Sequence, residues 1–264
     1  MTPTASLPPR AIASAAAFSP RPRPDAPMRL FCLPYAGGAA SLFRDWPGRL
    51  RTPVEVVAVE PPGRGARFGE PALGDAHRLA DALAEALLPW LDRPFALFGH
   101  SNGALMAFEI AHRLRDRGHL PALFFASAKN APGLVDERSP LHALPRAAFL
   151  DALRERGGTP PEFFEHPDLV ELYLPVLRAD FSLSETYRYR RREPLATTLV
   201  TVAGRDDPCM GEDALLGWRR EFHGPVSHHR IDGGHFFIDT HLDALAALID
   251  AHLATALAAA TARG

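Results

Sequence analysis

The sequence predicts an α/β protein with a mostly parallel sheet, helices on its faces and one helical insertion. Short apolar runs alternate with segments of helical spacing along most of the chain. Most of the runs are apolar at nearly every position, which is typical of strands covered on both faces. With 264 residues and 47% hydrophobic content, the chain can bury the core of one large domain.

The elements follow one another in a regular order. Strands are predicted for the apolar runs at 29–33, 54–59, 95–98, 123–127, 198–203 and 227–231. Helices are predicted where strong helix formers or helical spacing occur, at 76–90, 103–117, 213–222 and 242–257. This order favours parallel strands joined by right-handed crossovers. The alanine-rich end of the last helix, 251–262, is expected to fray.

One segment breaks the alternation. Residues 134–194 contain no convincing strand and three helical stretches, at 145–156, 166–178 and 182–190. A helical insertion between two strands is well placed to cover a site as a lid. The alternative is an elaboration that merely extends the core.

We therefore divide the chain into a core, an insertion and two end segments. The core comprises 28–133 and 195–258, and the lid insertion comprises 134–194. Residues 1–27, rich in proline and alanine, are predicted to be a flexible leader, and 259–264 a tail.

Composition narrows the classes of partner and compartment. The formal net charge of −2 gives no case for nucleic acid or an anionic membrane. The two cysteines, Cys32 and Cys209, are too few for a disulfide framework and suit a reducing compartment. The sequence lacks an uninterrupted apolar run of roughly 18 to 20 residues. We expect a soluble, cytoplasmic protein that binds neither nucleic acid nor membrane, and the sequence is compatible with a monomer.

A candidate nucleophile lies in Gly99-His100-Ser101-Asn102-Gly103, between a predicted strand and a predicted helix. This pattern predicts a nucleophile elbow, in which a sharp turn exposes the hydroxyl of Ser101. The flanking glycines leave room for the turn, and the helix N-terminus favours a developing negative charge. His100 is expected to pack inside the elbow. The alternative is a glycine-rich turn with an ordinary solvated serine.

Two later strand ends supply an acid and a base. Asp206 and Asp207 follow the strand at 198–203, and His235 follows a Gly-Gly pair after the strand at 227–231. Serine, acid and histidine in this order are typical of α/β-hydrolases. We favour Asp207 over Asp206 because Pro208 restrains the chain beside it.

An acyl-transfer site also needs donors for the oxyanion of the tetrahedral intermediate. One is expected to be the backbone N–H of Asn102, and the other the N–H of Ala36, in the loop after the first strand. The pair Gly37-Gly38 in that loop matches neither a P-loop nor a dinucleotide fingerprint. The neighbouring His228 and His229 would point to opposite faces of a strand, which argues against a metal site, and we predict no metal and no cofactor.

From 30 to 248 the chain resembles the stand-alone type II thioesterases of polyketide and nonribosomal peptide assembly lines. The resemblance rests on several stretches in the family's order. They are Leu33-Pro-Tyr-Ala-Gly-Gly38 with Phe43 and Trp46, Pro61-Pro-Gly-Arg-Gly-Ala-Arg67, the elbow, Gly204-Arg-Asp-Asp-Pro208 with Trp218, Gly233-Gly-His-Phe-Phe237, and 157–160, 174–180 and 186–189 in the insertion.

The resemblance implies the α/β-hydrolase fold with a lid, and hydrolysis of acyl thioesters on the phosphopantetheine arm of carrier proteins. It implies Ser101 as nucleophile, Asp207 as acid, His235 as base, and Ala36 and Asn102 as oxyanion donors. The family's elbow usually carries methionine at the position of Asn102, so the acyl pocket can differ.

The implied partner is an acyl or peptidyl carrier protein, which is typically acidic. Candidate docking arginines are Arg64, Arg67 and the cluster from Arg188 to Arg192, although local pairing is the alternative. Three other functions share parts of this pattern. They are a dedicated chain-release or acyl-transfer enzyme with the same triad, a general esterase, and a carrier-binding protein without activity.

Overall fold

A seven-stranded sheet forms the centre of the molecule in the computed structural model, which describes residues 16–134 and 140–261. The strand order is β1-β3-β2-β4-β5-β6-β7, and only the β1–β3 pair is antiparallel. The strands are β1 (Ala17–Phe18), β2 (Met28–Leu33), β3 (Val54–Val59), β4 (Phe95–His100), β5 (Leu123–Ser127), β6 (Thr198–Gly204) and β7 (Val226–Ile231). All six predicted strands are confirmed, with ends that differ by at most two residues.

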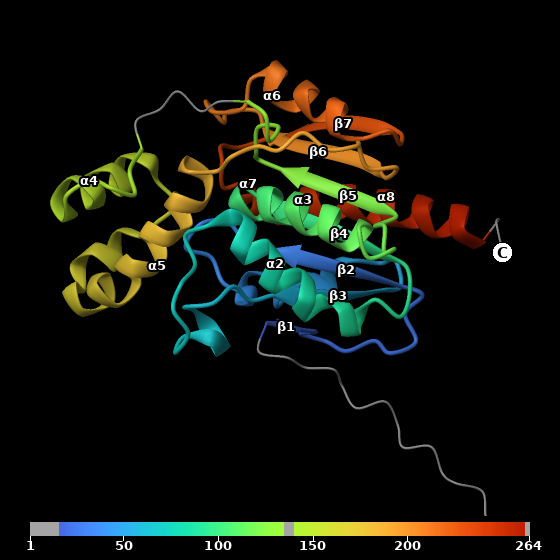
Figure 1. Ribbon diagram of the computed structural model, residues 1–264, viewed down its shortest axis with the longest axis horizontal. Helices are drawn as coiled ribbons and strands as arrows, with labels where there is room; N and C mark the ends of the chain where they lie inside the picture. Colours follow the sequence, from blue (N-terminus) through green and yellow to red (C-terminus); the bar gives the residue numbers. More distant parts are fainter. Residues whose placement is uncertain (1–15, 135–139, 262–264) are drawn as a thin grey trace, which may run out of the picture.

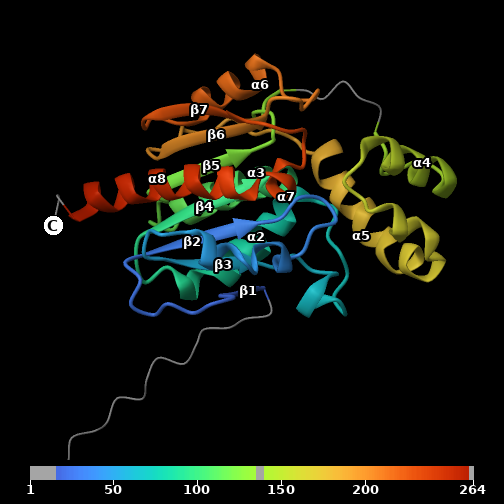
Figure 2. The same cartoon turned by 180° about the vertical axis from the view of Figure 1, so that it is seen from behind.

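Helices cover both faces of the sheet (Figures 1 and 2). On one face, α2 (Ala76–Leu87) and α3 (Asn102–Arg115) pack against side chains such as Phe31, Val57 and Leu97. On the other, α1 (Trp46–Arg49), α7 (Phe237–Thr240) and α8 (Leu242–Thr261) pack against the opposite faces of the same strands. Successive side chains of strands β2 to β6 therefore pack alternately into two cores, one on each face of the sheet. Burial on both faces explains why these strands are apolar at nearly every position.

Short helices complete the loops of the core. They are η1 (Ala40–Phe43), η2 (Gly65–Arg67), η3 (Leu88–Trp90), α6 (Glu212–Leu216) and η5 (Gly217–Glu221). The helix predicted at 213–222 is thus divided between α6 and η5. Trp218 fixes the second piece, because its buried ring donates from Nε1 to the carbonyl of Lys129 at 2.7 Å.

The lid insertion projects beyond the carboxyl ends of the strands (Figures 1 and 2). It consists of α4 (Arg146–Arg156), η4 (Pro161–Glu165) and α5 (Pro167–Glu185). Its helices share a small core of their own, centred on Phe149, Leu153 and Val170. This placement beside the strand ends brings the insertion to the edge where open parallel sheets place their sites.

Within the insertion, the prediction of separate helices at 166–178 and 182–190 is wrong. A single helix, α5, continues to Glu185, and the chain after it is extended. Helix α5 continues past residue 178 because the side chains of Asp180 and Leu183 are buried there. Beyond it, Tyr187 and Arg192 are drawn instead to a buried carboxylate on α3.

The two predicted end segments also differ from the structure. Strand β1 lies inside the proposed leader 1–27, where fully buried Ala17 pairs with Val59. A two-residue strand is too short to show a periodic pattern, and residues 1–15 lie outside the described residues. At the other end, α8 extends into the proposed tail 259–264 and the frayed region 251–262, because alanine is the strongest helix former.

One helix in the described part of the chain is long and apolar enough to cross a membrane by length and composition. It is α8, whose window Leu242–Ala259 has a mean hydropathy of 1.5. One stripe of this helix, with Leu245, Ile249 and Leu253, packs on the sheet.

Candidate active site

The turn between β4 and α3 carries Ser101 in a strained backbone conformation, with φ 54° and ψ −120°. Both flanking glycines are required by packing. A Cβ on Gly99 would lie 2.2 Å from the carbonyl of Gly103, and one on Gly103 would lie 2.2 Å from the carbonyl of Leu33. The predicted elbow is therefore confirmed as a turn, and its glycines permit the close approach of three backbone segments.

Ser101, His235 and Asp207 form a continuous hydrogen-bonded relay, although they come from three different strand ends. The hydroxyl Oγ of Ser101 lies 3.0 Å from Nε2 of His235, and Nδ1 of His235 lies 2.7 Å from Oδ2 of Asp207. Asp206 is exposed and contacts Gly233 through its backbone N–H. The structure thus brings Asp207, and not Asp206, to the histidine.

The environment of Asp207 keeps its carboxylate ionised. Burial of the side chain tends to raise its pKa, but the hydrogen bond and charge of His235 lower it below its usual value. The backbone N–H of Cys209 also donates to Oδ1 at 2.9 Å. A buried carboxylate bound in this way can hold the imidazole in one tautomer and orientation.

His100 binds the main chain of His235, a contact that the sequence did not reveal. Its Nε2 lies 2.9 Å from the backbone carbonyl of His235, and its Nδ1 lies 2.9 Å from Oγ of Ser127. Since a carbonyl only accepts, Nε2 donates to it and Nδ1 accepts from the hydroxyl. Burial lowers the pKa of His100 to about 3, so the ring is neutral and fixes the main chain of His235.

The loop after β2 forms a tight turn in which Gly38 donates to the carbonyl of Tyr35 at 2.9 Å. Within the described residues, the backbone N–H groups of Ala36 and Asn102 have no hydrogen-bond partner, as oxyanion donors require. A pocket of about 220 Å³ lies between this loop and the lid insertion. Its walls include Ala36, Gly158, Tyr173 and Leu177.

Three of the six predicted docking arginines are committed to internal contacts. Arg64 is buried and paired with Asp180, so the proposal that it docks a partner is wrong. Arg67 binds Glu70, with 2.6 Å between Nη2 and Oε2. Arg192 binds Glu109, whereas Arg188, Arg190 and Arg191 are exposed.

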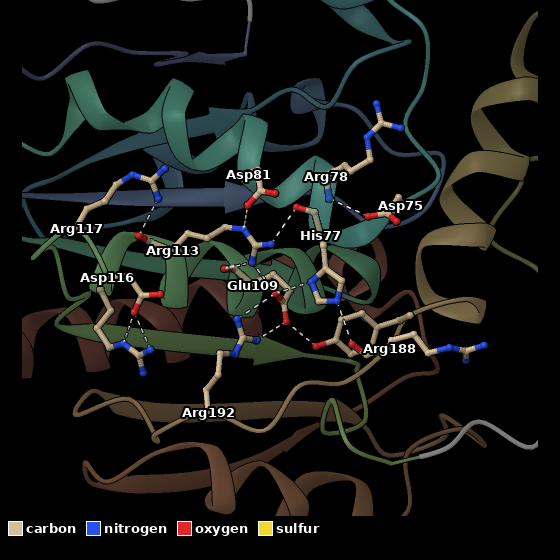
Figure 3. A network of polar contacts seen from close by, with 12 residues as sticks. Asp75, His77, Arg78, Asp81, Glu109, Arg113, Asp116, Arg117, Arg188 and Arg192 are labelled. Atoms are coloured by element: carbon tan, nitrogen blue, oxygen red, sulfur yellow. Dashed lines mark hydrogen bonds and ion pairs between the residues drawn. The ribbon is translucent and has the colours of Figure 1, made fainter.

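Glu109 on α3 is the centre of a buried polar network (Figure 3). Its carboxylate is fully buried and binds Arg113, with Nη1 to Oε2 at 2.6 Å, as well as Arg192, Tyr187 and His77. Burial tends to raise the pKa of Glu109, but the hydrogen bonds of Arg192 and Tyr187 bring it down to about 2. The network fastens the segment after α5 to α3 and so anchors the base of the insertion.

The histidine pair on β7 diverges, as its alternation predicts. His228 contacts Oγ1 of Thr201 through Nδ1 at 2.7 Å, whereas His229 faces His252 on α8. Among residues 16–134 and 140–261, there is no group of three His, Cys, Asp or Glu side chains that could hold a metal ion.

The fold and the relay define the chain as an α/β-hydrolase with a serine, histidine and aspartate at the strand ends. A family model described as a thioesterase domain matches residues 28–253. The chain belongs to this thioesterase family, and its solved neighbours include type II thioesterases, as the resemblance predicted.

Three relatives illustrate the match. Linear gramicidin dehydrogenase LgrE of Brevibacillus parabrevis is 41% identical, over 89% of this chain and 91% of its own. Thioesterase PikA5 of Streptomyces venezuelae is 36% identical, over 92% of this chain and 86% of its own. The solved type II thioesterase BorB from the borrelidin biosynthetic cluster has 34% identity and a TM-score of 0.84, and the match covers 91% of this chain and 98% of BorB.

Proposed function

We propose that this thioesterase removes aberrant or stalled acyl groups from the phosphopantetheine arm of carrier proteins in polyketide or nonribosomal peptide biosynthesis. The relatives come from such pathways, which supports an acyl or peptidyl carrier protein as partner. The reaction needs no cofactor on the enzyme, and we place the protein in the cytoplasm, where carrier-bound intermediates are made.

The first half-reaction transfers the acyl group to the enzyme. Nε2 of His235 takes the proton of Ser101 as Oγ attacks the thioester carbonyl carbon, and Asp207 stabilises the imidazolium. The N–H groups of Ala36 and Asn102 donate to the oxyanion. The carbon–sulfur bond then breaks, and the imidazolium gives its proton to the departing pantetheine thiolate.

The second half-reaction regenerates the enzyme. His235 removes a proton from water, whose oxygen attacks the acyl-serine carbonyl, and a second oxyanion forms in the same position. When this intermediate collapses, the proton on His235 returns to Oγ of Ser101. The products are a free carboxylic acid and the unloaded carrier.

The observation that carries the proposal is the relay from Ser101 to Asp207, with distances of 3.0 and 2.7 Å. The pocket beside Ala36 supports it, because it offers an acyl chain a site lined by Tyr173 and Leu177 of the insertion. A thiolate leaves more readily than an alkoxide or an amine, so a site of this kind is expected to cleave thioesters fastest.

The test is the rate of acyl release from a phosphopantetheinylated carrier protein, compared with a free acyl thioester and a simple oxygen ester. We expect the carrier thioester to be cleaved fastest and Ser101→Ala to lose release from all three substrates. Equal or faster cleavage of the simple ester would instead favour a general esterase.

Product analysis separates hydrolysis from acyl transfer. Free acid is expected when the loaded carrier is mixed with the enzyme alone. An ester or amide of an added alcohol or amine, formed in preference to free acid, would identify a dedicated chain-release or transfer enzyme. Unchanged biological activity of Ser101→Ala would indicate a binding protein.

A further inference from the structure

A single residue of the lid insertion contacts both segments that carry the expected oxyanion donors. This residue is Asp180, in the last third of α5, and only 3% of its surface is exposed. Its side chain reaches the loop after β2, and its main chain reaches the elbow. Neither contact involves Ser101, His235 or Asp207.

The carboxylate of Asp180 holds the loop that contains Ala36. Its Oδ2 accepts from the backbone N–H of Gly37 at 2.7 Å. Both of its oxygens bind the guanidinium of Arg64, with 2.7 Å between Nη2 and Oδ1. Arg64 in turn donates to the carbonyl of Gly38 at 3.2 Å. The buried ion pair therefore holds two peptide groups of the loop, Ala36–Gly37 and Gly38–Ala39.

These bonds leave the N–H group of Ala36 in the turn for a ligand. Gly38 donates to Tyr35, and Gly37 donates to Asp180, so Ala36 keeps the donor that neither contact uses. The turn requires glycine at position 37, where φ is +77° and a Cβ would lie 2.8 Å from Leu177 of α5. The conformation of this turn is thus set against α5 by both a hydrogen bond and close packing.

The second contact joins α5 to the elbow. Nδ2 of Asn102 donates to the backbone carbonyl of Asp180 at 2.6 Å, and the Asn102 side chain is buried. The backbone N–H of Asn102 is the other expected oxyanion donor. Asp180 consequently links the peptide that follows one donor, Ala36–Gly37, to the residue that carries the other.

We propose that Asp180 is a positioning residue that holds the two oxyanion donors, Ala36 and Asn102, in register, and that it makes their alignment depend on the seating of α5. The inference rests on the proposed function, because it takes the roles of Ala36 and Asn102 from it. The lid insertion then acts on the chemical step as well as on the shape of the pocket. An α5 helix that moves away releases the Gly37 N–H and lets the turn relax.

The variants Asp180→Ala, Asp180→Asn and Asn102→Leu separate the contacts. Asp180→Ala removes the bonds to both Gly37 and Arg64, and Asp180→Asn keeps an acceptor but loses the charge. Asn102→Leu removes the side-chain bond to α5 and leaves the Asp180 carboxylate in place. Glu171→Gln is the matched control, because Glu171 lies on the same helix as Asp180 and its ion pair, with Arg146 of α4, is exposed. Thermal unfolding establishes that each variant is folded.

The first readout is hydrolysis of an acyl-N-acetylcysteamine thioester. Because a displaced oxyanion donor acts on the transition state, we expect Asp180→Ala to lower kcat about 10- to 100-fold while KM stays within about threefold. Asp180→Asn should retain more activity than Asp180→Ala. Asn102→Leu should lower kcat by about 3- to 10-fold, and Glu171→Gln should leave it unchanged.

The second readout compares two inhibitors of the same acyl chain. A trifluoromethyl ketone forms an oxyanion on Ser101, whereas the corresponding secondary alcohol occupies the pocket without one. We expect the affinity of Asp180→Ala and Asn102→Leu for the ketone to fall in parallel with kcat, and their affinity for the alcohol to stay the same. An equal loss for both inhibitors would overturn the proposal, as would an unchanged kcat in folded Asp180→Ala.

Two further outcomes are distinguishable. If Asp180→Ala does not fold, Asp180→Asn and Asn102→Leu carry the comparison, and normal ketone affinity in both would overturn the inference. If wild type binds the ketone covalently but cleaves no acyl thioester, the proposed function fails while the inhibitor comparison still tests the role of Asp180.

Discussion

Ser101 occupies a backbone conformation that few residues other than glycine adopt. Its φ of 54° places it in a sparsely populated region, which costs of the order of 1 to 3 kcal/mol. The surrounding sheet and helix hold it there, because the elbow is bounded by the close approaches at Gly99 and Gly103. The strain is part of the device that presents Oγ above the sheet.

This strain predicts a difference in stability between two inactive variants at position 101. Ser101→Gly should raise the free energy of unfolding by about 1 kcal/mol relative to Ser101→Ala, since glycine accepts the conformation without a Cβ. Both variants should be inactive. Urea unfolding at equilibrium measures the difference, and equal stability of the two variants would contradict the account of strain.

His100 gives a second prediction at the residue scale. Its Nε2 holds the backbone carbonyl of His235 at 2.9 Å, so its removal should loosen the base without touching the substrate. We expect His100→Ala to lower kcat by about tenfold or more with little change in KM. His100→Gln, which can still donate to the carbonyl, should recover part of the loss. Steady-state kinetics of both variants decide, and equal activities would exclude a positioning role for this bond.

Part of the candidate site could be predicted from the sequence. The order of Ser101, Asp207 and His235 and their places after strands are visible in the sequence, because parallel strands end at one edge of the sheet. Asp206 and Asp207 are neighbours in the same loop, so only the detailed loop conformation decides which of them reaches the histidine. The restraint by Pro208 correctly favours Asp207, which binds His235. The contacts of Asp180 and His100 join segments far apart in the chain, and no local pattern indicates them.

At the scale of elements, the strands were predictable because burial on both faces leaves a continuous apolar run. The continuation of α5 to Glu185 and the extended segment after it were not, since Tyr187, which lies within the predicted helix 182–190, and Arg192 bind Glu109 across the fold. Strand β1 and helices α1 and α7 are too short to produce a period. Tertiary contacts, and not local propensity, determine where these elements form and end.

The Glu109 network predicts which ion pair matters for the insertion. Glu109→Gln leaves Arg192 and Arg113 without a buried counter-charge and should lower the free energy of unfolding by about 3 to 5 kcal/mol. The matched control is Glu85→Gln, which breaks an exposed pair with Arg117 and should cost at most about 1 kcal/mol. Denaturant unfolding of the two variants compares them, and equal losses would show that the network does not anchor the segment.

For the whole molecule, buried titratable groups predict marked sensitivity to acid. Burial lowers the pKa of both His100 and His112 to about 3, from an ordinary value of 6.5. The unfolded chain therefore binds protons at a higher pH than the folded one. The free energy of unfolding should fall as the pH drops from about 6.5 towards 3, and Glu109, with a folded pKa of about 2, extends the loss below pH 4.5.

His112 allows this prediction to be tested with one substitution. Within the described chain, neither ring nitrogen of His112 has a hydrogen-bond partner, and the ring packs edge-on against Phe108. His112→Leu should reduce the slope of unfolding free energy against pH between 3 and 6.5 by up to about 1.4 kcal/mol per pH unit. Unfolding curves at a series of pH values provide the slope, and an unchanged slope would mean that His112 does not stay neutral in the folded state.

The whole account depends on Ser101 forming a covalent bond to the acyl group of a carrier protein. Rapid mixing of the enzyme with an acyl-loaded carrier, acid quenching and mass mapping of the peptides tests this most directly. The account predicts a transient acyl adduct on the peptide that contains Ser101, which forms before free acid appears and does not form in Ser101→Ala. Acid release without an adduct, or an adduct on another residue such as Cys209, would contradict it.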